Sequence, residues 1–403
     1  MSLKGIEDIR AAQARLNGVA FMTPLAPSPH LGKLVGAPVW LKLENLQRTG
    51  SFKLRGAFNR LSQLAKERPG AAVSAASAGN HAQGVAVSAA MLGLNAVIFM
   101  PRGASLSKRQ ATAGAGAEVR LTGESVADCL QAARALEPGH VFIHPYDDPE
   151  IIAGQGSLGL EIMAQLPEAE AVLVPVGGGG LIAGVAAAVK AVSPATQVIG
   201  VQAAAAPAAS AALAAGGPQS VTTRPTLADG VRIARIGEAA YPLILRHVDR
   251  LVAVEEEHIS QAMLLLLERR RIVAEGAGAL GLAAMLAGLL PELAGKRVVI
   301  LVSGGNVDSN LLGRIIDQGL VRSGRIWRFA VVIPDRPGAL AGLLNDLARR
   351  EANVLTVNHD RLGRNLPADR TLVHLELETL GFDHAGRIAA GLAAAGHIIR
   401  EEP

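Results

Sequence analysis

The sequence of 403 residues has a single cysteine, Cys129, and aromatic residues make up only 3% of it. One cysteine excludes an internal disulfide and a cysteine-rich zinc site. An excess of charge of one sign is also missing, because 39 Lys and Arg stand against 35 Asp and Glu. This balance argues against a nucleic-acid partner. The first ten residues carry scattered charges and no apolar run, so we expect no signal peptide and a cytoplasmic protein.

One uncharged apolar stretch, 171–189, could be mistaken for a membrane span. It contains Pro175 and four consecutive glycines. Both features break a long helix, so the stretch predicts a strand, a glycine loop and the start of a helix. We therefore expect no membrane partner.

Glycine is abundant, with 45 residues, and half of the chain is hydrophobic, which is typical of a globular α/β enzyme. From about residue 35 to 320, short β-branched runs alternate with alanine-rich helical stretches, and this alternation predicts a doubly wound fold. Runs such as AVLVPV are apolar throughout, as expected for parallel strands buried on both faces. Segment 203–225 is expected to be loop and loose helix. The predicted strands are 39–43, 71–76, 96–100, 118–121, 141–144, 171–176, 197–202 and 297–303.

The pattern changes near residue 321, which predicts a domain 1–320, a hinge 321–326 and a second domain 327–403. The second domain is expected to contain strand 327–333, helix 337–350, strands 353–359 and 371–377, helix 384–394 and strand 397–400. This βαββαβ order is typical of a ferredoxin-like fold. A turn at Asp335, Pro337 and Gly338 precedes its first helix, where backbone amides can face a ligand.

Lys53 stands among small and apolar residues at a predicted helix start. Burial lowers the pKa of a lysine and prepares its amine for Schiff-base formation or proton removal. Three loops follow predicted strands in the same domain: SAGNH (77–81), GGGGL (177–181) and SGGN (303–306). Amides at helix starts suit a carboxylate or phosphate, and the carboxyl ends of parallel strands are where α/β sheets bind ligands. His144 is expected to be a strand-end residue and not a metal ligand.

Seven motifs together resemble those of the fold-type II pyridoxal-phosphate enzymes, and most closely the threonine ammonia-lyase branch. The resemblance covers about Ile6 to Gly324 and implies a two-lobed catalytic domain with a smaller lobe at roughly 50–150. The C-terminal part resembles an ACT regulatory domain, with PDRPGAL (334–340) as its effector loop. The motifs are SFKLRGA (51–57), SAGNHAQG (77–84), GQGSLGLE (154–161), PVGGGGL (175–181), ADGV (228–231), EGAGA (275–279) and SGGN (303–306).

The resemblance implies pyridoxal 5'-phosphate as cofactor and a role for each matching residue. Lys53 holds the cofactor through a Schiff base and removes the Cα proton, Asn80 hydrogen-bonds its phenolic oxygen, and Ser303 faces its pyridine nitrogen. Glu275 is assigned at most a supporting position behind the site, and the ordinary alternative for it is a carboxylate that caps a helix. The phosphate is assigned to Gly177, Gly178, Gly179, Gly180 and Leu181, the ring to the vicinity of Gly230, and the substrate carboxylate to Ser77, Ala78, Gly79, Asn80 and His81.

A neutral serine does not keep the pyridine nitrogen protonated, which favours elimination over transamination. The expected reaction is β-elimination of L-threonine, and of L-serine, to 2-oxobutanoate or pyruvate and ammonia. Serine racemase is the near alternative. That branch uses as its second acid or base a serine two residues before the asparagine that corresponds to Asn80. Ala78 stands at this position here and cannot deliver a proton. A hydroxyaspartate dehydratase or a dehydratase that prefers serine also remains open, because the sequence does not reveal the pocket for the β-methyl group. A non-catalytic amino-acid sensor is disfavoured, because it has no use for Lys53, Asn80 and Ser303 together.

Three further expectations concern partners. Gln202 stands where some members of the family carry an acid, so we expect no strong divalent metal site. The ACT resemblance implies an amino-acid effector, for which isoleucine or valine is the suggestion. The family usually assembles, and a lone βαββαβ sheet exposes an edge, so we expect a homodimer or homotetramer.

Overall fold

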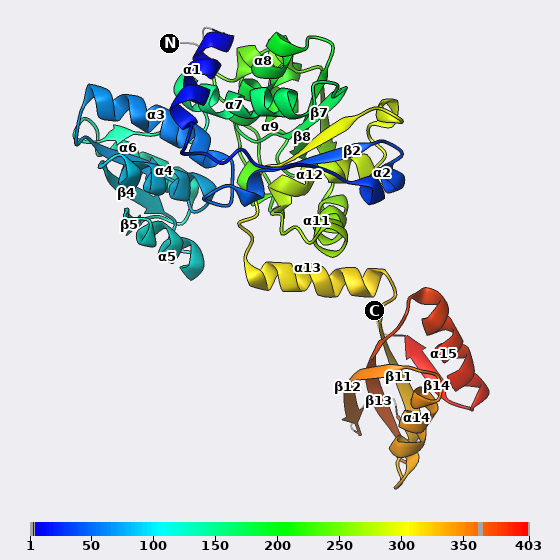
Figure 1. The fold of residues 1–403 in the computed structure, drawn as a ribbon. Helices are drawn as coiled ribbons and strands as arrows, with labels where there is room; N and C mark the ends of the chain where they lie inside the picture. The colour runs from blue at the N-terminus through cyan, green and yellow to red at the C-terminus, as the bar shows by residue number, and fades with distance from the viewer. Residues whose placement is uncertain (1–2, 4, 362–365, 402–403) are drawn as a thin grey trace. The chain divides into compact units, whose positions relative to one another are not determined.

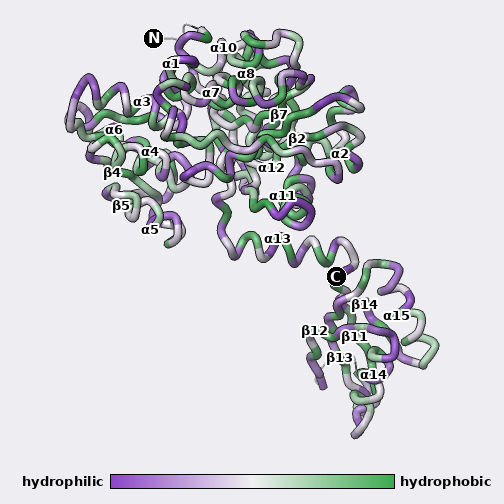
Figure 2. Tube along the Cα trace, in the orientation of Figure 1, coloured by the Kyte–Doolittle hydropathy of each residue, from purple (hydrophilic) through white to green (hydrophobic). Residues whose placement is uncertain are grey.

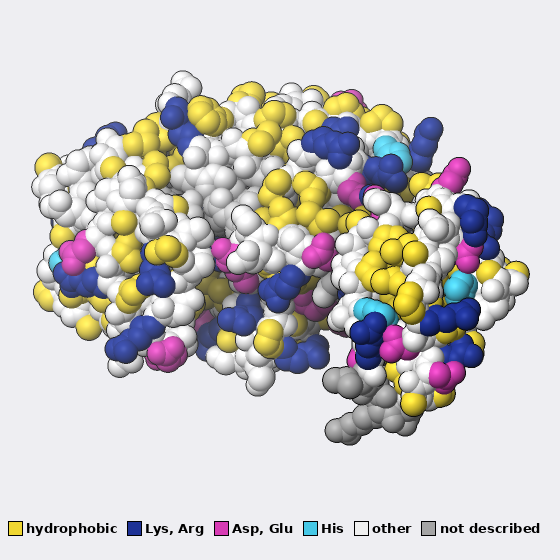
Figure 3. All heavy atoms as spheres, turned by 90° about the horizontal axis from the view of Figure 1, so that it is seen from below, with side chains coloured by type: hydrophobic (Ala, Val, Ile, Leu, Met, Phe, Trp, Pro, Cys, Tyr) yellow, Lys and Arg dark blue, Asp and Glu magenta, His cyan; other side chains and the backbone are white. Residues whose placement is uncertain are grey.

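The computed structural model describes residue 3 and residues 5–361 and 366–401. The chain divides into two compact units, Met1–Asp308 and Ser309–Pro403, so helix α13 (Ser309–Arg322) belongs to the second unit (Figure 1). Within the described residues, no helix combines the length and the apolar character needed to cross a bilayer. On the face drawn in Figure 3, basic and acidic side chains are interspersed and do not gather into one basic surface.

The first unit is built on a six-stranded sheet in the order β1-β2-β10-β7-β8-β9. Strand β1 pairs antiparallel with β2, and the other pairs are parallel. Every residue of β7 and β10 is buried, as the apolar runs predict, and Figure 2 shows the hydrophobic character along β7. The strands are β1 (Leu25–Pro27), β2 (Val39–Leu43), β7 (Ala171–Pro175), β8 (Gln197–Ala203), β9 (Arg250–Val254) and β10 (Val298–Val302).

Helices cover both faces of this sheet. Figure 1 shows α7 (Pro149–Gln165) and α8 (Gly180–Val192) on one side, and α11 (Glu256–Arg270) and α12 (Gly276–Leu286) on the other. This arrangement explains why the central strands are apolar on both faces. The remaining elements are α1 (Ile6–Leu16), α2 (Pro29–Val35), α9 (Ala208–Ala215), α10 (Tyr241–His247) and the short helices η1 (Glu44–Leu46), η2 (Asp229–Val231) and η3 (Pro291–Leu293).

A second, smaller sheet lies in the chain between β2 and β7. Its four strands are parallel, in the order β5-β4-β3-β6, and it has a hydrophobic core of its own. Its strands are β3 (Ala72–Ala76), β4 (Asn95–Met100), β5 (Glu118–Leu121) and β6 (Val141–Phe142). Its helices are α3 (Lys53–Glu67), α4 (Asn80–Met91), α5 (Leu106–Gly114) and α6 (Val126–Arg134).

The predicted strand 141–144 is too long. Strand β6 ends at Phe142, because the chain turns around His144. The Nδ1 atom of His144 accepts hydrogen bonds from the backbone N–H groups of Tyr146 and Asp147, at 3.3 and 2.8 Å. Pro145, which lies between His144 and Tyr146, has no N–H group to continue the hydrogen-bond ladder of the strand. His144 therefore closes a turn two residues beyond the strand.

The second unit contains an antiparallel sheet in the order β12-β13-β11-β14, compatible with the expected ferredoxin-like plan. Phe329, Val331, Leu343 and Leu392 are buried in its separate core. After α13 its elements are β11 (Ile326–Pro334), α14 (Ala339–Ala348), β12 (Asn353–Asp360), β13 (Arg370–Glu378), α15 (Phe382–Ala394) and β14 (Ile398–Glu401).

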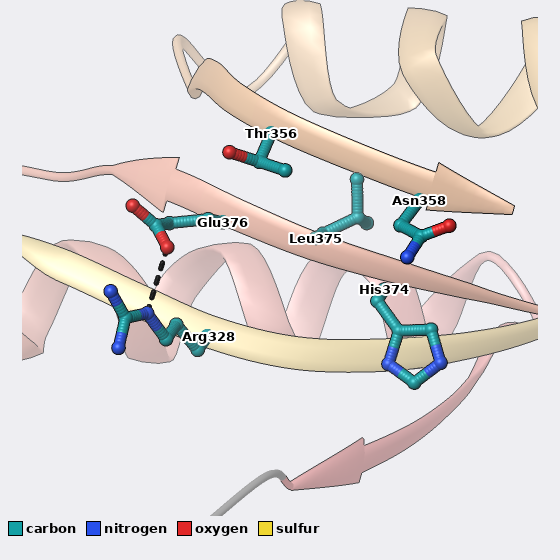
Figure 4. A pocket seen from close by; sticks show the side chains of 6 residues that line it. All are labelled: Arg328, Thr356, Asn358, His374, Leu375 and Glu376. Atoms are coloured by element: carbon teal, nitrogen blue, oxygen red, sulfur yellow. Dashed lines mark hydrogen bonds and ion pairs between the residues drawn. The ribbon is translucent and has the colours of Figure 1, made fainter.

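A hollow of about 290 Å³ lies on this sheet, where β11, β12 and β13 run side by side (Figure 4). Groups of both charges face it, and the Nε atom of Arg328 donates to Glu376 at 2.7 Å. The hollow is lined by Arg328, Thr356, Asn358, His374, Leu375 and Glu376.

Candidate active site

Most of the predicted site residues lie in the loops that follow β3, β7 and β10, whereas Lys53 opens α3 and Gly230 lies in η2. After β10, the carbonyl oxygen of Ser303 accepts the N–H of Phe52 at 3.1 Å, and Gly304 forms an isolated bridge with Ser51. Helix α4 lies close behind, because a Cβ atom on Gly84 would stand 3.1 Å from the carbonyl carbon of Lys53. The start of α3 is therefore held between the loop after β10 and the helix after β3.

Lys53 is the first residue of α3. Its Nζ atom donates a hydrogen bond to the carbonyl oxygen of Pro145 at 2.7 Å and lies 5.3 Å from the centre of the Phe52 ring. Burial lowers the pKa of Lys53 to about 8, and the charge of Glu275 opposes this shift. A lysine with this pKa has far more neutral amine near neutral pH than an exposed one, as a nucleophile or proton acceptor requires.

Asn80 opens helix α4 and connects two other loops of the site. Its Nδ2 atom donates to Glu275, with the two carboxylate oxygens at 2.8 and 3.0 Å. Its Oδ1 atom accepts from Nδ2 of Asn306 at 2.7 Å, and the same Nδ2 donates to the carbonyl oxygen of Thr49 at 2.8 Å. One continuous set of hydrogen bonds thus joins the segment before Lys53 to the starts of α4 and α12.

Glu275 occupies the N-cap position of α12, but its side chain makes no cap hydrogen bond there. The alternative of a helix-capping carboxylate is therefore wrong, because the carboxylate faces Asn80 instead. Only 5% of Glu275 is exposed. Burial raises its pKa to about 7, and the hydrogen bond from Asn80 opposes this shift.

The glycine loop after β7 requires glycine because its neighbours approach closely. A Cβ atom on Gly178 would lie 2.4 Å from the Tyr146 ring, and one on Gly177 would lie 2.8 Å from the Cα atom of Val231. Gly179 has φ +93°, and α8 begins at Gly180. The first N–H groups of a helix have no intrahelical partner, so this turn offers several donors to an anion. Leu181 follows in the first turn and is buried.

In the loop after β3, the hydroxyl of Ser77 accepts the N–H of Gly79 at 3.1 Å, and Ala78 lies between them. His81 is buried, and its Nε2 atom lies 3.0 Å from the carbonyl oxygen of Ile143. Burial, with a contribution from Lys53, lowers the pKa of His81 to about 3. His81 is therefore uncharged at neutral pH. A carboxylate bound here would depend on backbone N–H groups and Asn80, and not on an imidazolium.

Gly230, in η2, lies beside the same cluster, since a Cβ atom on it would stand 3.6 Å from a carboxylate oxygen of Glu275. Ser303 is buried at the end of β10. The contacts thus link Asn80 and Gly230 directly to Glu275, and they link Lys53 to the glycine loop through Pro145 and Tyr146. Sequence reasoning missed Tyr146, which carries no local signal, and assigned no role to Asn306, although it belongs to the SGGN motif.

The predicted effector loop lies in the second unit. Asp335 pairs with the Nε atom of Arg361 at 3.2 Å. Gly338 has φ +85° and precedes α14, so Pro337 and Gly338 form a tight turn at that helix start. The hollow of Figure 4 is lined by a different set of residues from those of this loop.

A buried ion network lies behind the start of α3. Arg55 donates to Glu44 at 2.8 Å and to Glu161 at 2.6 Å, and Lys42 donates to Glu161 at 2.7 Å. All four residues are at most 6% exposed. The network joins β2, η1, α3 and α7, and so ties the helix that carries Lys53 to both lobes.

Gln202, at the position considered for a cation, is buried in β8 and hydrogen-bonded to Ser210 of α9. Among the residues that the structure describes, no group of three or more His, Cys, Asp or Glu side chains stands where it could hold a metal ion.

A family model described as "Pyridoxal-phosphate dependent enzyme" matches residues 17–304. An L-threonine ammonia-lyase of Thermotoga maritima is 47% identical over 98% of both chains. Among solved structures, a threonine deaminase from T.th. is 43% identical with a TM-score of 0.71, covering 75% of this chain and 99% of its own. Maize serine racemase is 33% identical with a TM-score of 0.74, covering 79% of this chain and 99% of its own.

Proposed function

Because the chain belongs to the family of pyridoxal-phosphate dependent enzymes, we propose that it deaminates L-threonine by β-elimination, giving 2-oxobutanoate and ammonia. The observation that carries this proposal is the placement of Lys53, whose amine has a lowered pKa and lies among the loops after β3, β7 and β10. The similarity to an L-threonine ammonia-lyase along 98% of the chain supports threonine as the substrate. L-Serine is proposed as a second substrate, because it carries the same β-hydroxyl leaving group.

The residues of the site fit the cofactor. The glycine loop is so closely packed that a Cβ atom on Gly177 or Gly178 would collide with its neighbours. Because these residues have no side chains, the backbone N–H groups of the turn can bind a phosphate directly. Ser51, two residues before Lys53, is fully buried, and its hydroxyl has no hydrogen-bond partner among the described residues. Buried hydroxyls are normally paired, so this one indicates a site completed by a bound group.

The bound cofactor supplies an electron sink for negative charge at the substrate Cα. Lys53 would anchor the cofactor, and its amine, neutral when free, would accept the Cα proton. The N–H groups of the 77–81 loop, at the start of α4, hold the substrate carboxylate. The neutral hydroxyl of Ser303 would face the pyridine nitrogen and would not keep that nitrogen protonated, which favours loss of the β-hydroxyl.

Serine racemisation is the second candidate, because maize serine racemase shares the fold. Racemisation needs a second acid or base on the face opposite Lys53. Ala78 has no titratable group, and this favours elimination. Incubation with L-serine should therefore release pyruvate with little D-serine, and D-serine as the main product would refute this assignment.

For the second unit we propose an ACT-type regulatory role, with Asp335, Pro337 and Gly338 in the effector loop. Its antiparallel βαββαβ sheet and the match of an L-threonine ammonia-lyase along almost the whole chain support this proposal. Isoleucine or valine should change the threonine dependence of the rate. A rate that responds to neither amino acid would contradict regulation by these two effectors.

We also propose a homodimer or homotetramer. Strand β12 is an edge strand of eight residues, and such an edge is a common site of pairing between chains. Light scattering of the purified protein tests this, and a monomeric mass would contradict it.

An assay of the purified protein with L-threonine tests the whole proposal. The visible absorbance of the cofactor Schiff base and the release of 2-oxobutanoate are followed together. Both signals are expected. Absorbance without keto-acid release would keep the cofactor and Lys53 but refute threonine as the substrate, and hydroxyaspartate would be tested next.

A further inference from the structure

The orientation of the Asn80 amide follows from its neighbours. The Thr49 carbonyl oxygen can only accept a hydrogen bond, so the atom of Asn306 that faces it at 2.8 Å must be Nδ2. The same Nδ2 lies 2.7 Å from the nearer atom of Asn80, which must therefore be the acceptor Oδ1. A backbone carbonyl thus determines which way two side-chain amides point.

The other end of the Asn80 amide is set by the same logic. Its Nδ2 group faces Glu275, whose two oxygens lie at 2.8 and 3.0 Å and, when ionised, can only accept. The amide is thereby held between a donor, Asn306, and an acceptor, Glu275. A flip of Asn80 would place donor against donor at Asn306 and, with Glu275 ionised, acceptor against acceptor at Glu275.

Space for this arrangement is provided by Gly50. A Cβ atom on Gly50, which has φ +70°, would lie 2.4 Å from Oδ1 of Asn306. Gly50 and Thr49 belong to the segment that leads to Lys53. The contact therefore aligns Asn80 with the same stretch of backbone that positions the amine.

We propose that Asn306 is a positioning residue that, with the Thr49 carbonyl, fixes the Asn80 side chain as a hydrogen-bond donor for the cofactor's phenolic oxygen, while Glu275 accepts the remaining hydrogen. This inference rests on the proposed function. It assigns Asn306 a polar role that depends on its N–H donors and not on its volume. If Asn306 only filled space, a substitution that keeps its shape would be milder than one that removes its side chain, and the polar role predicts the reverse.

Those substitutions are Asn306→Asp and Asn306→Ala. Aspartate keeps the shape but removes both donors, so the introduced carboxylate would draw the NH2 group of Asn80 toward itself and turn Oδ1 toward Glu275 and the cofactor. Alanine removes the contact without reversing Asn80. We expect cofactor affinity to fall about tenfold for Asn306→Ala, which is the scale of one lost buried hydrogen bond. Asn306→Asp should bind about tenfold more weakly still, or worse, because it turns an acceptor of Asn80 toward the cofactor.

The measurement is a titration of each cofactor-depleted variant with pyridoxal phosphate, followed by the visible absorbance, together with thermal unfolding of the cofactor-free protein. Asn95→Asp, the same change at an exposed position at the start of β4, is the control and should bind like the unmodified chain. An Asn306→Ala variant that binds as weakly as Asn306→Asp, or more weakly, would overturn the inference. Failure of the unmodified chain to bind the cofactor would instead refute the proposed function.

A second pair of variants keeps the test decisive if Asn306→Asp does not fold. Glu275→Gln retains an acceptor oxygen for Asn80, whereas Glu275→Leu retains none. The glutamine variant should bind the cofactor at least about tenfold more tightly than the leucine variant. Equal affinity of the two would show that Glu275 does not orient Asn80.

Discussion

The Nζ atom of Lys53 lies 2.7 Å from the carbonyl oxygen of Pro145, and this contact links the amine to the glycine loop. The next residue, Tyr146, packs its ring on Gly178. Asp147 then accepts the N–H groups of Glu238 and Ala239 at 3.0 and 2.8 Å. Pro145 and Tyr146 therefore connect the amine to the anion-binding turn, and Asp147 holds this segment against Glu238 and Ala239.

The lowered pKa of Lys53 predicts the pH dependence of cofactor capture. Only the neutral amine forms a Schiff base, so the capture rate of the cofactor-free enzyme should rise with pH through about 8 and not through 10.5, the ordinary pKa of lysine. Rapid-mixing absorbance measurements between about pH 6 and pH 9.5 test this. Lys53→Ala should abolish both the absorbance change and turnover. A rate that is still rising steeply at the upper end of this range would contradict the lowered pKa.

Glu275 predicts an effect of pH on stability. Its pKa is about 7 in the folded protein against 4.5 ordinarily, so folding favours its protonated form. The stability gained in this way is complete below about pH 4.5 and is lost as the pH rises through about 7. Glu275→Gln removes this titration, so its free energy of unfolding relative to the unmodified chain should increase from pH 4.5 to 8 by on the order of 3 kcal/mol.

Urea unfolding of the cofactor-free proteins measures this difference. Glu67→Gln, at an exposed position of α3, should show none of it. A constant difference between Glu275→Gln and the unmodified chain at every pH would be inconsistent with a buried, titrating Glu275.

The buried ion network predicts a large loss of stability on removal of one charge. Glu161 accepts from both Lys42 and Arg55, so Glu161→Gln leaves two buried cations with too little negative charge. We expect the free energy of unfolding to fall by about 3–5 kcal/mol. Glu7→Gln removes the exposed pair with Arg10 and should cost less than about 1 kcal/mol. Similar losses for the two variants would contradict the importance of burial.

A hydroxyl group introduced at position 78 should change the products formed from L-serine. Ala78→Ser places a proton-carrying group in the loop that opens α4, so the variant should form D-serine from L-serine while the unmodified chain forms pyruvate almost alone. Chiral chromatography of the products measures the ratio. An unchanged ratio in a variant that still releases pyruvate would show that Ala78 does not face the substrate Cα.

Sequence patterns predicted the central strands well, because β7 and β10 are apolar on both faces and need no tertiary context to be recognised. Strand β9 was missed because it lies at a sheet edge, where Arg250 and Ala253 are exposed and the apolar run is interrupted. Strand β1 was missed because it has three residues and ends in Pro27. Both depend on a neighbouring strand and not on their own composition.

In the site, too, local motifs were predicted from the sequence and contacts between distant residues were not. Lys53, Asn80 and the glycine loop stand in local motifs that the sequence displays. The contacts of Glu275 with Asn80 and of Tyr146 with Gly178 join residues far apart in the chain, and no local pattern indicates them. The split of the chain at Asp308 also depends on packing, because α13 continues the helical pattern of the first unit while belonging to the second.

The place of β10 in the large sheet has a consequence for how the protein is made. It pairs with β2 on one side and with β7 on the other, although it follows both in the chain by more than 120 residues. On the ribosome, the two halves of the sheet must wait for residues 298–302 before they can join, and such long-range pairing is slow. Because Ser303 and Asn306 follow directly, the ligand site is completed in the same late step, so a nascent chain stalled before β10 should be unable to capture its cofactor.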